Sequence, residues 1–192
     1  MNKKAFLLFL TIGLPVVIFL FLKGFGRNEF SIPILYEQGL GDSLATPCLE
    51  KKKAQYVVKN NLVPEGIKII HFERLDGPVL KTRLEELERV QDVFYDDLGI
   101  SLNTFVNANS LAISDIQDYD QRIEFLDSFW KKKGLDSLEW ANLKYCSMAM
   151  TDLDNRVVLI DEENRIRGYY NILEREETDR LILELRILQT ED

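Results

Sequence analysis

The sequence has few of the residues that build metal and redox centres. Its 192 residues include two cysteines and one histidine. Two cysteines are too few for a disulfide scaffold or an all-cysteine zinc site, and a single histidine excludes any multi-histidine metal site. That histidine, His71, lies among apolar residues in IKIIHF, which favours a hydrogen-bonded core histidine over a catalytic base. The motifs of phosphate-binding loops, zinc proteases and serine hydrolases are absent as well.

Acidic residues are absent from the first 27 positions, although the protein as a whole is acidic. All 32 acidic residues follow Arg27, together with 20 of the 24 lysines and arginines, which gives residues 28–192 a formal charge of −12. A surface of this charge repels phosphate backbones, so we expect no binding to nucleic acid. Apolar residues make up 46% of the chain, which is enough for a domain with its own core.

Charge of either sign is absent from Ala5–Leu22, an apolar run of 18 residues. A helix of this length rises about 27 Å, enough to cross the hydrocarbon core of a bilayer. Lys3 and Lys4 precede the run, which favours an N-terminus on the inside of the membrane. We therefore expect a single-pass anchor in the cell (inner) membrane that carries a soluble domain on the periplasmic side. Cleavage near Gly24–Gly26, as in a signal peptide, is the alternative.

The rest of the chain alternates between β-rich segments and amphipathic helices. This order predicts an α/β fold, with a thioredoxin-like mixed sheet flanked by helices and extra N-terminal strands. We divide the chain into an anchor (1–27), an N-terminal strand and connection (28–54) and the thioredoxin-like domain (55–192). The expected strands are Glu29–Tyr36, Gln55–Val58, Ile67–Phe72, Ile100–Val106, Arg156–Ile160 and Arg165–Tyr170, and the expected helices are Leu80–Phe94, a second that begins at Asp118 or Asp120 and ends at Lys133, and Glu176–Leu188.

Three stretches of the sequence match the pattern of one family. Val157–Leu185, which reads VVLIDEENRIRGYYNILEREETDRLILEL, resembles the end of the Sco/SenC family. Leu87–Asp97 resembles the helix that follows the active site of that family, and Leu138–Trp140 lies where the family often has a tryptophan-containing strand. Members are membrane-anchored thioredoxin-fold proteins that help to assemble the copper site of cytochrome oxidase. The resemblance covers roughly residues 55–188 and implies this fold.

The copper ligands of the family do not carry over to this sequence. Its C-x-x-x-C pair falls on Asp76 and Leu80, and its histidine falls at about Leu153. Aspartate is a hard oxygen ligand and leucine is no ligand, whereas Cu(I) prefers thiolate, thioether or imidazole. The resemblance therefore implies a divergent member that lacks the redox cysteines, and we expect neither an enzyme nor a bound cofactor.

Sulfur-containing residues could form a relocated copper site. Cys146, Met148 and Met150 alternate in CSMAM, so in a strand their sulfurs would share one face. His71 or Cys48 could supply a further ligand. This arrangement predicts a Cu(I) carrier as the alternative function. The same residues are also ordinary filler of a half-buried strand.

Cys48 and Cys146 could instead pair with each other. An even number of cysteines and an oxidising compartment favour a disulfide, while buried free thiols are the alternative. A bridge would exclude a copper site at Cys146. A thiol oxidoreductase is a weaker hypothesis, because the short spacing that lets one thiol resolve the other is absent.

Our leading hypothesis is a non-catalytic binding or assembly protein that recognises a subunit of a respiratory cytochrome oxidase or another assembly factor. The resemblance places its contact surface at the tip that holds the active site in the family. This tip comprises the Thr151–Asn155 loop and the end of the central strand, and its candidate residues are Glu73, Arg74, Asp76, Gly77, Pro78, Asp152, Asp154 and Asn155.

Overall fold

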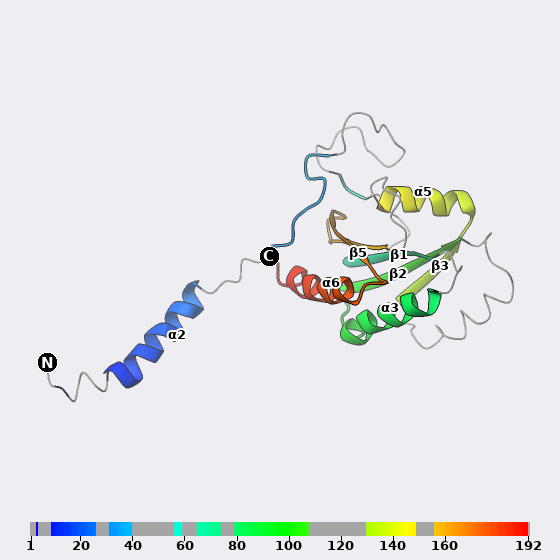
Figure 1. The fold of residues 1–192 in the computed structure, drawn as a ribbon. Coiled ribbons are helices and arrows are strands. Elements are labelled where there is room, and N and C mark those ends of the chain that lie inside the picture. The colour runs from blue at the N-terminus through cyan, green and yellow to red at the C-terminus, as the bar shows by residue number, and fades with distance from the viewer. Residues whose placement is uncertain are drawn as a thin grey trace. The chain divides into compact units, whose positions relative to one another are not determined.

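Two units make up the chain in the computed structural model, Met1–Ser31 and Ile32–Asp192. The structure describes residues 3, 9–25, 31–39, 56–58, 65–73, 79–107, 130–148 and 156–191. Figure 1 shows the helix of the first unit and the sheet and helices of the second.

The first unit contains a short π-helical turn, η1 (Phe9–Gly13), followed by helix α2 (Leu14–Phe25). Pro15 lies just after η1, and because proline has no N–H to donate, it interrupts the regular helical hydrogen-bond pattern at this junction. Large apolar side chains such as Phe19 and Leu20 are exposed. Within the residues that the structure describes, no helix has the length and apolar character needed to cross a membrane.

The second unit is built on a five-stranded sheet in the order β3-β2-β1-β4-β5. The central strand β1 (Ile67–Glu73) is parallel to β2 (Ile100–Asn107), which is parallel to β3 (Trp130–Leu135). On its other side β1 pairs antiparallel with β4 (Arg156–Ile160), and β4 pairs antiparallel with β5 (Ile166–Asn171). This mixed sheet confirms the predicted thioredoxin-like topology.

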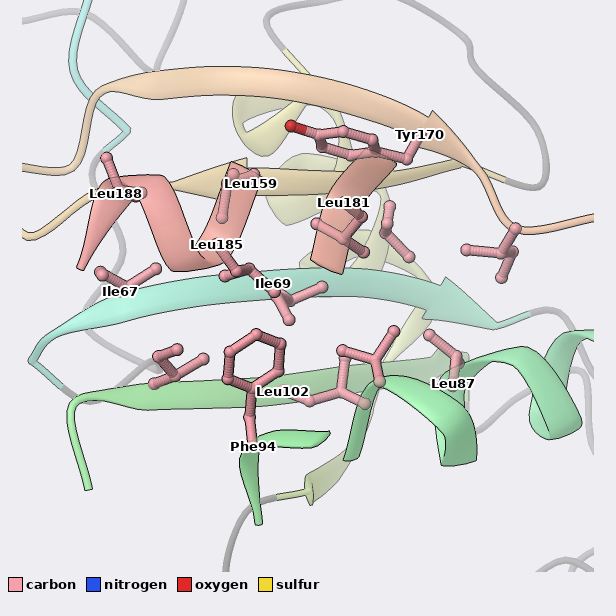
Figure 2. Packing of buried hydrophobic residues seen from close by; sticks show 14 of the residues in the cluster. Ile67, Ile69, Leu87, Phe94, Leu102, Leu159, Tyr170, Leu181, Leu185 and Leu188 are labelled. Atoms are coloured by element: carbon pink, nitrogen blue, oxygen red, sulfur yellow. The ribbon is translucent and has the colours of Figure 1, made fainter. Parts of the chain in front are cut away.

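Helices cover both faces of the sheet (Figure 1). Helices α3 (Leu80–Phe94) and α6 (Arg175–Leu188) lie on what we term the first face, and α5 (Ser137–Ser147) lies on the second face. The first face is packed mainly by aliphatic side chains, as Figure 2 shows. Its fully buried members are Ile69, Leu87, Val90, Leu102, Val157, Leu159, Tyr170, Ile172, Leu181 and Leu185.

The extra N-terminal strands are not present in the described part of the chain. Residues 31–39 and 56–58 have no strand structure, and residues 35–38 form a turn. Tyr36 has a φ of 58°, which lies in the left-handed region and is incompatible with a strand. Pro33 has no N–H to donate to a ladder. The Leu35 N–H donates to the Ile166 carbonyl at 2.8 Å, and Nη2 of Arg167 donates to the Ile32 carbonyl at 2.6 Å, so two hydrogen bonds join this segment to β5.

Two further expectations about secondary structure are wrong. The predicted helix ending at Lys133 is replaced from Trp130 onward by β3, whose register with β2 runs from Leu102 to Asn107. Its lysines suit an edge strand, where charge discourages pairing with another chain. The predicted strand around Cys146 is instead the end of α5. Asp136 caps that helix by accepting the N–H groups of Leu138 and Glu139, both at 2.9 Å, which is the strongest local signal for a helix start.

Candidate functional site

The carboxyl end of β1 carries a buried polar cluster where the family motif predicted an active site. His71 and Glu73 alternate on the strand and therefore project to the same side, toward α3 on the first face. Both are 1% exposed. Two ionisable groups withdrawn from water in this way need partners.

Arg83, in the first turn of α3, supplies the partner of Glu73. Its Nη2 donates to Oε1 of Glu73 at 2.6 Å and its Nε donates to Oε2 at 3.2 Å. The Arg83 side chain is itself buried. The two parallel bonds form a bidentate pair that fixes the relative position of strand and helix. The carboxylate is therefore held by the fold and is not presented to solvent.

His71 completes the cluster without being a proton-transfer group accessible to a substrate. Its Nδ1 lies 3.3 Å from Oγ1 of Thr104 on β2, and its Nε2 lies 3.6 Å from Oε2 of Glu73. Burial lowers the pKa of His71 to about 4, although Glu73 opposes this shift. The imidazole is thus neutral at pH 7. The prediction of a hydrogen-bonded core histidine is confirmed.

Glu73 was predicted to lie on a contact surface, and this expectation is wrong. Its side chain is buried in the pair with Arg83 and offers nothing to a partner protein. Sequence reasoning missed Arg83, although a signal was present. Arg83 follows Leu80 by three positions and precedes Leu87 by four, which places it on the apolar side of α3. A charged residue on such a face implies a buried partner.

The other residues of the predicted tip are not part of the described structure. Of the three positions that correspond to the family's copper ligands, Leu80 alone is described, as the first residue of α3. The remaining predicted residues lie outside the described ranges: Arg74, Asp76, Gly77, Pro78, Asp152, Leu153, Asp154 and Asn155.

The relocated copper site rested on a strand that the structure does not contain. Cys146 lies in α5 and Met148 is its C-cap. Residues two apart on a helix point in nearly opposite directions and so do not share a face. Met148 is fully buried, while Met150 lies outside the described residues. Across the described ranges, no group of three or more histidine, cysteine, aspartate or glutamate side chains is placed to hold a metal ion.

Cys146 is disulfide-bonded. Cys48, the second cysteine of the sequence, lies outside the described residues. The backbone carbonyl of Cys146 also accepts a hydrogen bond of 2.5 Å from the hydroxyl of Tyr56. Cys146 therefore helps to fasten α5 to its surroundings.

Comparison with known proteins gives structural neighbours without sequence relatives. No protein-family model matches the sequence, and no curated protein is significantly similar to it. Among solved structures, the chain is similar to a Sco/SenC family lipoprotein from Bacillus anthracis, with a TM-score of 0.53 and 11% identity over 65% of this chain and 82% of that one. It is also similar to BsSco, a member of the Sco family of cytochrome c oxidase assembly proteins, with a TM-score of 0.51 and 10% identity over 66% of this chain and 82% of that one. Identities this low show a shared fold.

Proposed function

We propose that this protein is a membrane-anchored, extracytoplasmic binding protein that takes part in the assembly of a respiratory cytochrome oxidase and catalyses no redox reaction itself. The likeness of its fold to Sco/SenC structures, together with the resemblance of Val157–Leu185 to that family, supports the link to oxidase assembly.

The observation that carries the non-catalytic role is the Glu73–Arg83 pair at the end of β1. Thiol chemistry at this place would need an exposed, activated sulfur. The strand instead ends in a carboxylate that is buried and held by two hydrogen bonds from Arg83. The next residues of the sequence bring Asp76 and Leu80 to the positions where the family has cysteines. A buried ion pair of this kind has a structural role, so a partner protein would be recognised by the exposed residues around it.

The apolar N-terminal segment supports the membrane location. Ten of the thirteen residues from Phe9 to Phe21 are apolar, and most of the side chains in this run are exposed. Apolar side chains exposed on all sides of a helix suit a lipid environment better than water. Extraction of cell membranes with alkaline carbonate tests this part of the proposal. We expect the protein to stay in the pellet, and its release into the supernatant would contradict an anchor.

Co-purification tests the assembly role. The tagged full-length protein is captured from detergent-solubilised membranes, and the bound proteins are identified by mass spectrometry. We expect enrichment of an oxidase subunit or an oxidase assembly factor over a tag-only control. A capture that contains no respiratory or assembly protein would overturn the proposal.

The non-catalytic part has its own test. We expect the full-length protein to reduce a test disulfide no faster than buffer does. A Cu(I) carrier would need a free Cys146 thiol, and Cys146 is disulfide-bonded. A Cu(I) competition titration separates the two roles, because tight one-to-one binding that is lost in Cys146→Ser would replace the proposed role with copper transfer.

A further inference from the structure

We propose that the outer edge of β3 binds a short, acidic, extended segment of a partner protein, which adds to the sheet as a further strand. This inference rests on the binding role proposed above and gives that role a place and a partner chemistry. The edge is separate from the buried cluster at the end of β1.

The two edges of the sheet differ in how their backbone groups are used. At the β5 edge, three carbonyls already accept hydrogen bonds from neighbouring segments, namely those of Ile166, Tyr169 and Asn171. β3 ends the strand order on the opposite side. Within the described residues, β3 pairs with β2 alone, and none of its backbone groups bonds to any other segment. An edge of this kind can accept an extended peptide as an added strand.

The charge of β3 selects the kind of segment that can add to it. β3 reads WKKKGL and so carries three lysines in succession, Lys131, Lys132 and Lys133. Their partners on β2 are all uncharged: Asn103, Thr104 and Phe105. Lys133 is exposed and forms no ion pair with a described residue. Opposite charges on facing residues of neighbouring strands attract, so acidic side chains on an added strand would supply the charge that β2 does not.

The same lysines exclude other occupants of the edge. A second copy of β3 would bring lysines against lysines, and like charges at facing positions repel. Lysine on an edge strand is for this reason a common means of preventing edges from pairing with their own copies. A neutral strand meets no such repulsion but gains no attraction either. The edge therefore discriminates in favour of acidic strands.

The overall charge of the protein limits how acidic the segment can be. Residues 28–192 carry a formal charge of −12, so a long acidic segment would be repelled by the rest of the surface. Charges more than about 8–10 Å apart are largely screened at physiological ionic strength, so the lysines dominate only close to β3. The nearby carboxylate of Asp136 is used to cap α5. The edge therefore favours an acidic run about as short as the run of lysines.

β3 reaches the end of the sheet where the sequence places the contact surface. β1, β2 and β3 are parallel, so their carboxyl ends lie together (Figure 1). The register pairs Glu73 with Val106, and the next residue of β2, Asn107, pairs with Leu135. A partner that recognises this end of the domain would thus meet the last residues of β3.

Fluorescence polarisation on the detergent-solubilised full-length protein tests the charge of the segment. The probes are labelled heptapeptide amides with threonine and valine at both ends and three central residues that are all glutamate, all glutamine or all lysine. We expect the glutamate probe to bind at least tenfold more tightly than the glutamine probe, and the lysine probe not to bind. Equal binding of the glutamate and glutamine probes, or no binding of either, would overturn the proposal.

Substitution of the lysines tests where the probe binds. In what we term the β3 variant, glutamine replaces all three lysines: Lys131→Gln, Lys132→Gln and Lys133→Gln. The matched control removes three exposed basic groups from α3 and α6 and changes the net charge equally: Lys81→Gln, Arg175→Gln and Arg186→Gln. We expect the β3 variant to bind the glutamate and glutamine probes equally and the control to keep the preference. An equal loss in both variants would assign the preference to overall charge and contradict a site on β3.

N-methylation of the glutamate probe tests strand addition on the unaltered protein, so this test does not depend on the folding of any variant. A strand added to a sheet edge uses the N–H groups of alternate residues. We expect N-methylation at one parity of positions to weaken binding at least tenfold and methylation at the other parity to change it little. Uniform effects at every position would rule out strand addition.

Failure of this inference can be told apart from failure of the proposed function. If the β3 variant captures the same oxidase or assembly proteins as the unaltered protein, the assembly role stands and the β3 edge is not its binding site. If the peptide tests succeed while the capture contains no such protein, the β3 edge binds acidic segments and the oxidase link is wrong.

Discussion

The two faces of the sheet are packed by different means. On the first face, α3 and α6 bury regularly spaced leucines against the strands, with Leu87, Leu181 and Leu185 fully inaccessible (Figure 2). On the second face, α5 buries only Leu143 and Ser147 in its span, while Leu138 is 72% exposed. Burial of many side chains stabilises the first helix layer, whereas α5 combines a smaller apolar contact, made by Leu143, Met148 and Trp140, with a few individual interactions.

Two hydrogen bonds and a disulfide connect α5 to its surroundings on the second face. The Tyr56 hydroxyl donates to the Cys146 carbonyl at 2.5 Å, and Nε1 of Trp140 donates to the Phe105 carbonyl at 3.0 Å. The disulfide of Cys146 is a third. The comparison teaches that the contribution of α5 can be tested one interaction at a time, whereas the burial on the first face is shared among many side chains and its buried charge is the exception.

The largest effect is expected from the disulfide. Cys48 and Cys146 are 98 positions apart in the sequence, and a bridge across that distance stabilises by about 4–5 kcal/mol in the chain-entropy model. We expect Cys146→Ser to lower the free energy of unfolding by this amount, measured by urea unfolding followed by tryptophan fluorescence. Cys48→Ser should cost the same, and the double variant no more. A neutral Cys48→Ser would show that the two cysteines do not pair.

The second-largest effect is expected from the buried ion pair between Glu73 and Arg83 on the first face. Arg83→Met removes both guanidinium hydrogen bonds from the buried Glu73 carboxylate, which costs about 3–5 kcal/mol. Adding Glu73→Gln should restore most of that loss, because the uncompensated charge is then gone. Lys81→Met is the matched control on the same helix, since Lys81 pairs with Glu85 in solvent at 3.5 Å. Its effect should stay within about 0.5 kcal/mol. Equal losses for Arg83→Met and Lys81→Met would contradict the buried-pair account.

Lowering the pH should reduce the free energy of unfolding, because His71 is buried on the first face in its neutral form. Burial lowers the pKa of His71 from 6.5 to about 4 in the folded protein. Between these values the unfolded chain binds a proton that the folded protein does not, so the free energy of unfolding falls as the pH drops from 6.5 toward 4. The loss is up to about 3 kcal/mol. His71 is the one histidine of the chain, so His71→Gln should flatten this pH dependence in the same unfolding assay. An unchanged slope in His71→Gln would assign it to carboxylates instead.

The contrast between the faces also explains what could be predicted from the sequence. The leucine spacing of α3 and the strand patterns of β1, β4 and β5 indicated these elements, because regular burial leaves a period in the sequence. α5 leaves no such period, since it buries few side chains, and its one clear signal is the cap at Asp136. β3 is an edge strand of lysines whose structure depends on pairing with β2. The Glu73–Arg83 pair joins residues ten apart, and only the packing of α3 on β1 brings them together.

The smallest effect is expected from loss of the hydrogen bond between the Tyr56 hydroxyl and the Cys146 carbonyl on the second face. Burial raises the pKa of Tyr56 to about 12, so its hydroxyl remains a donor to Cys146 throughout the neutral range. Tyr56→Phe removes that bond and leaves the carbonyl short of one partner, at a cost of about 1 kcal/mol. Tyr145→Phe is the control, since Tyr145 lies on the same helix as Cys146 and is 38% exposed. Thermal unfolding of both variants measures the difference. If the Tyr56 variant lost no more stability than the control, this hydrogen bond would not contribute to stability. α5 would then be held by the disulfide and by its apolar contacts.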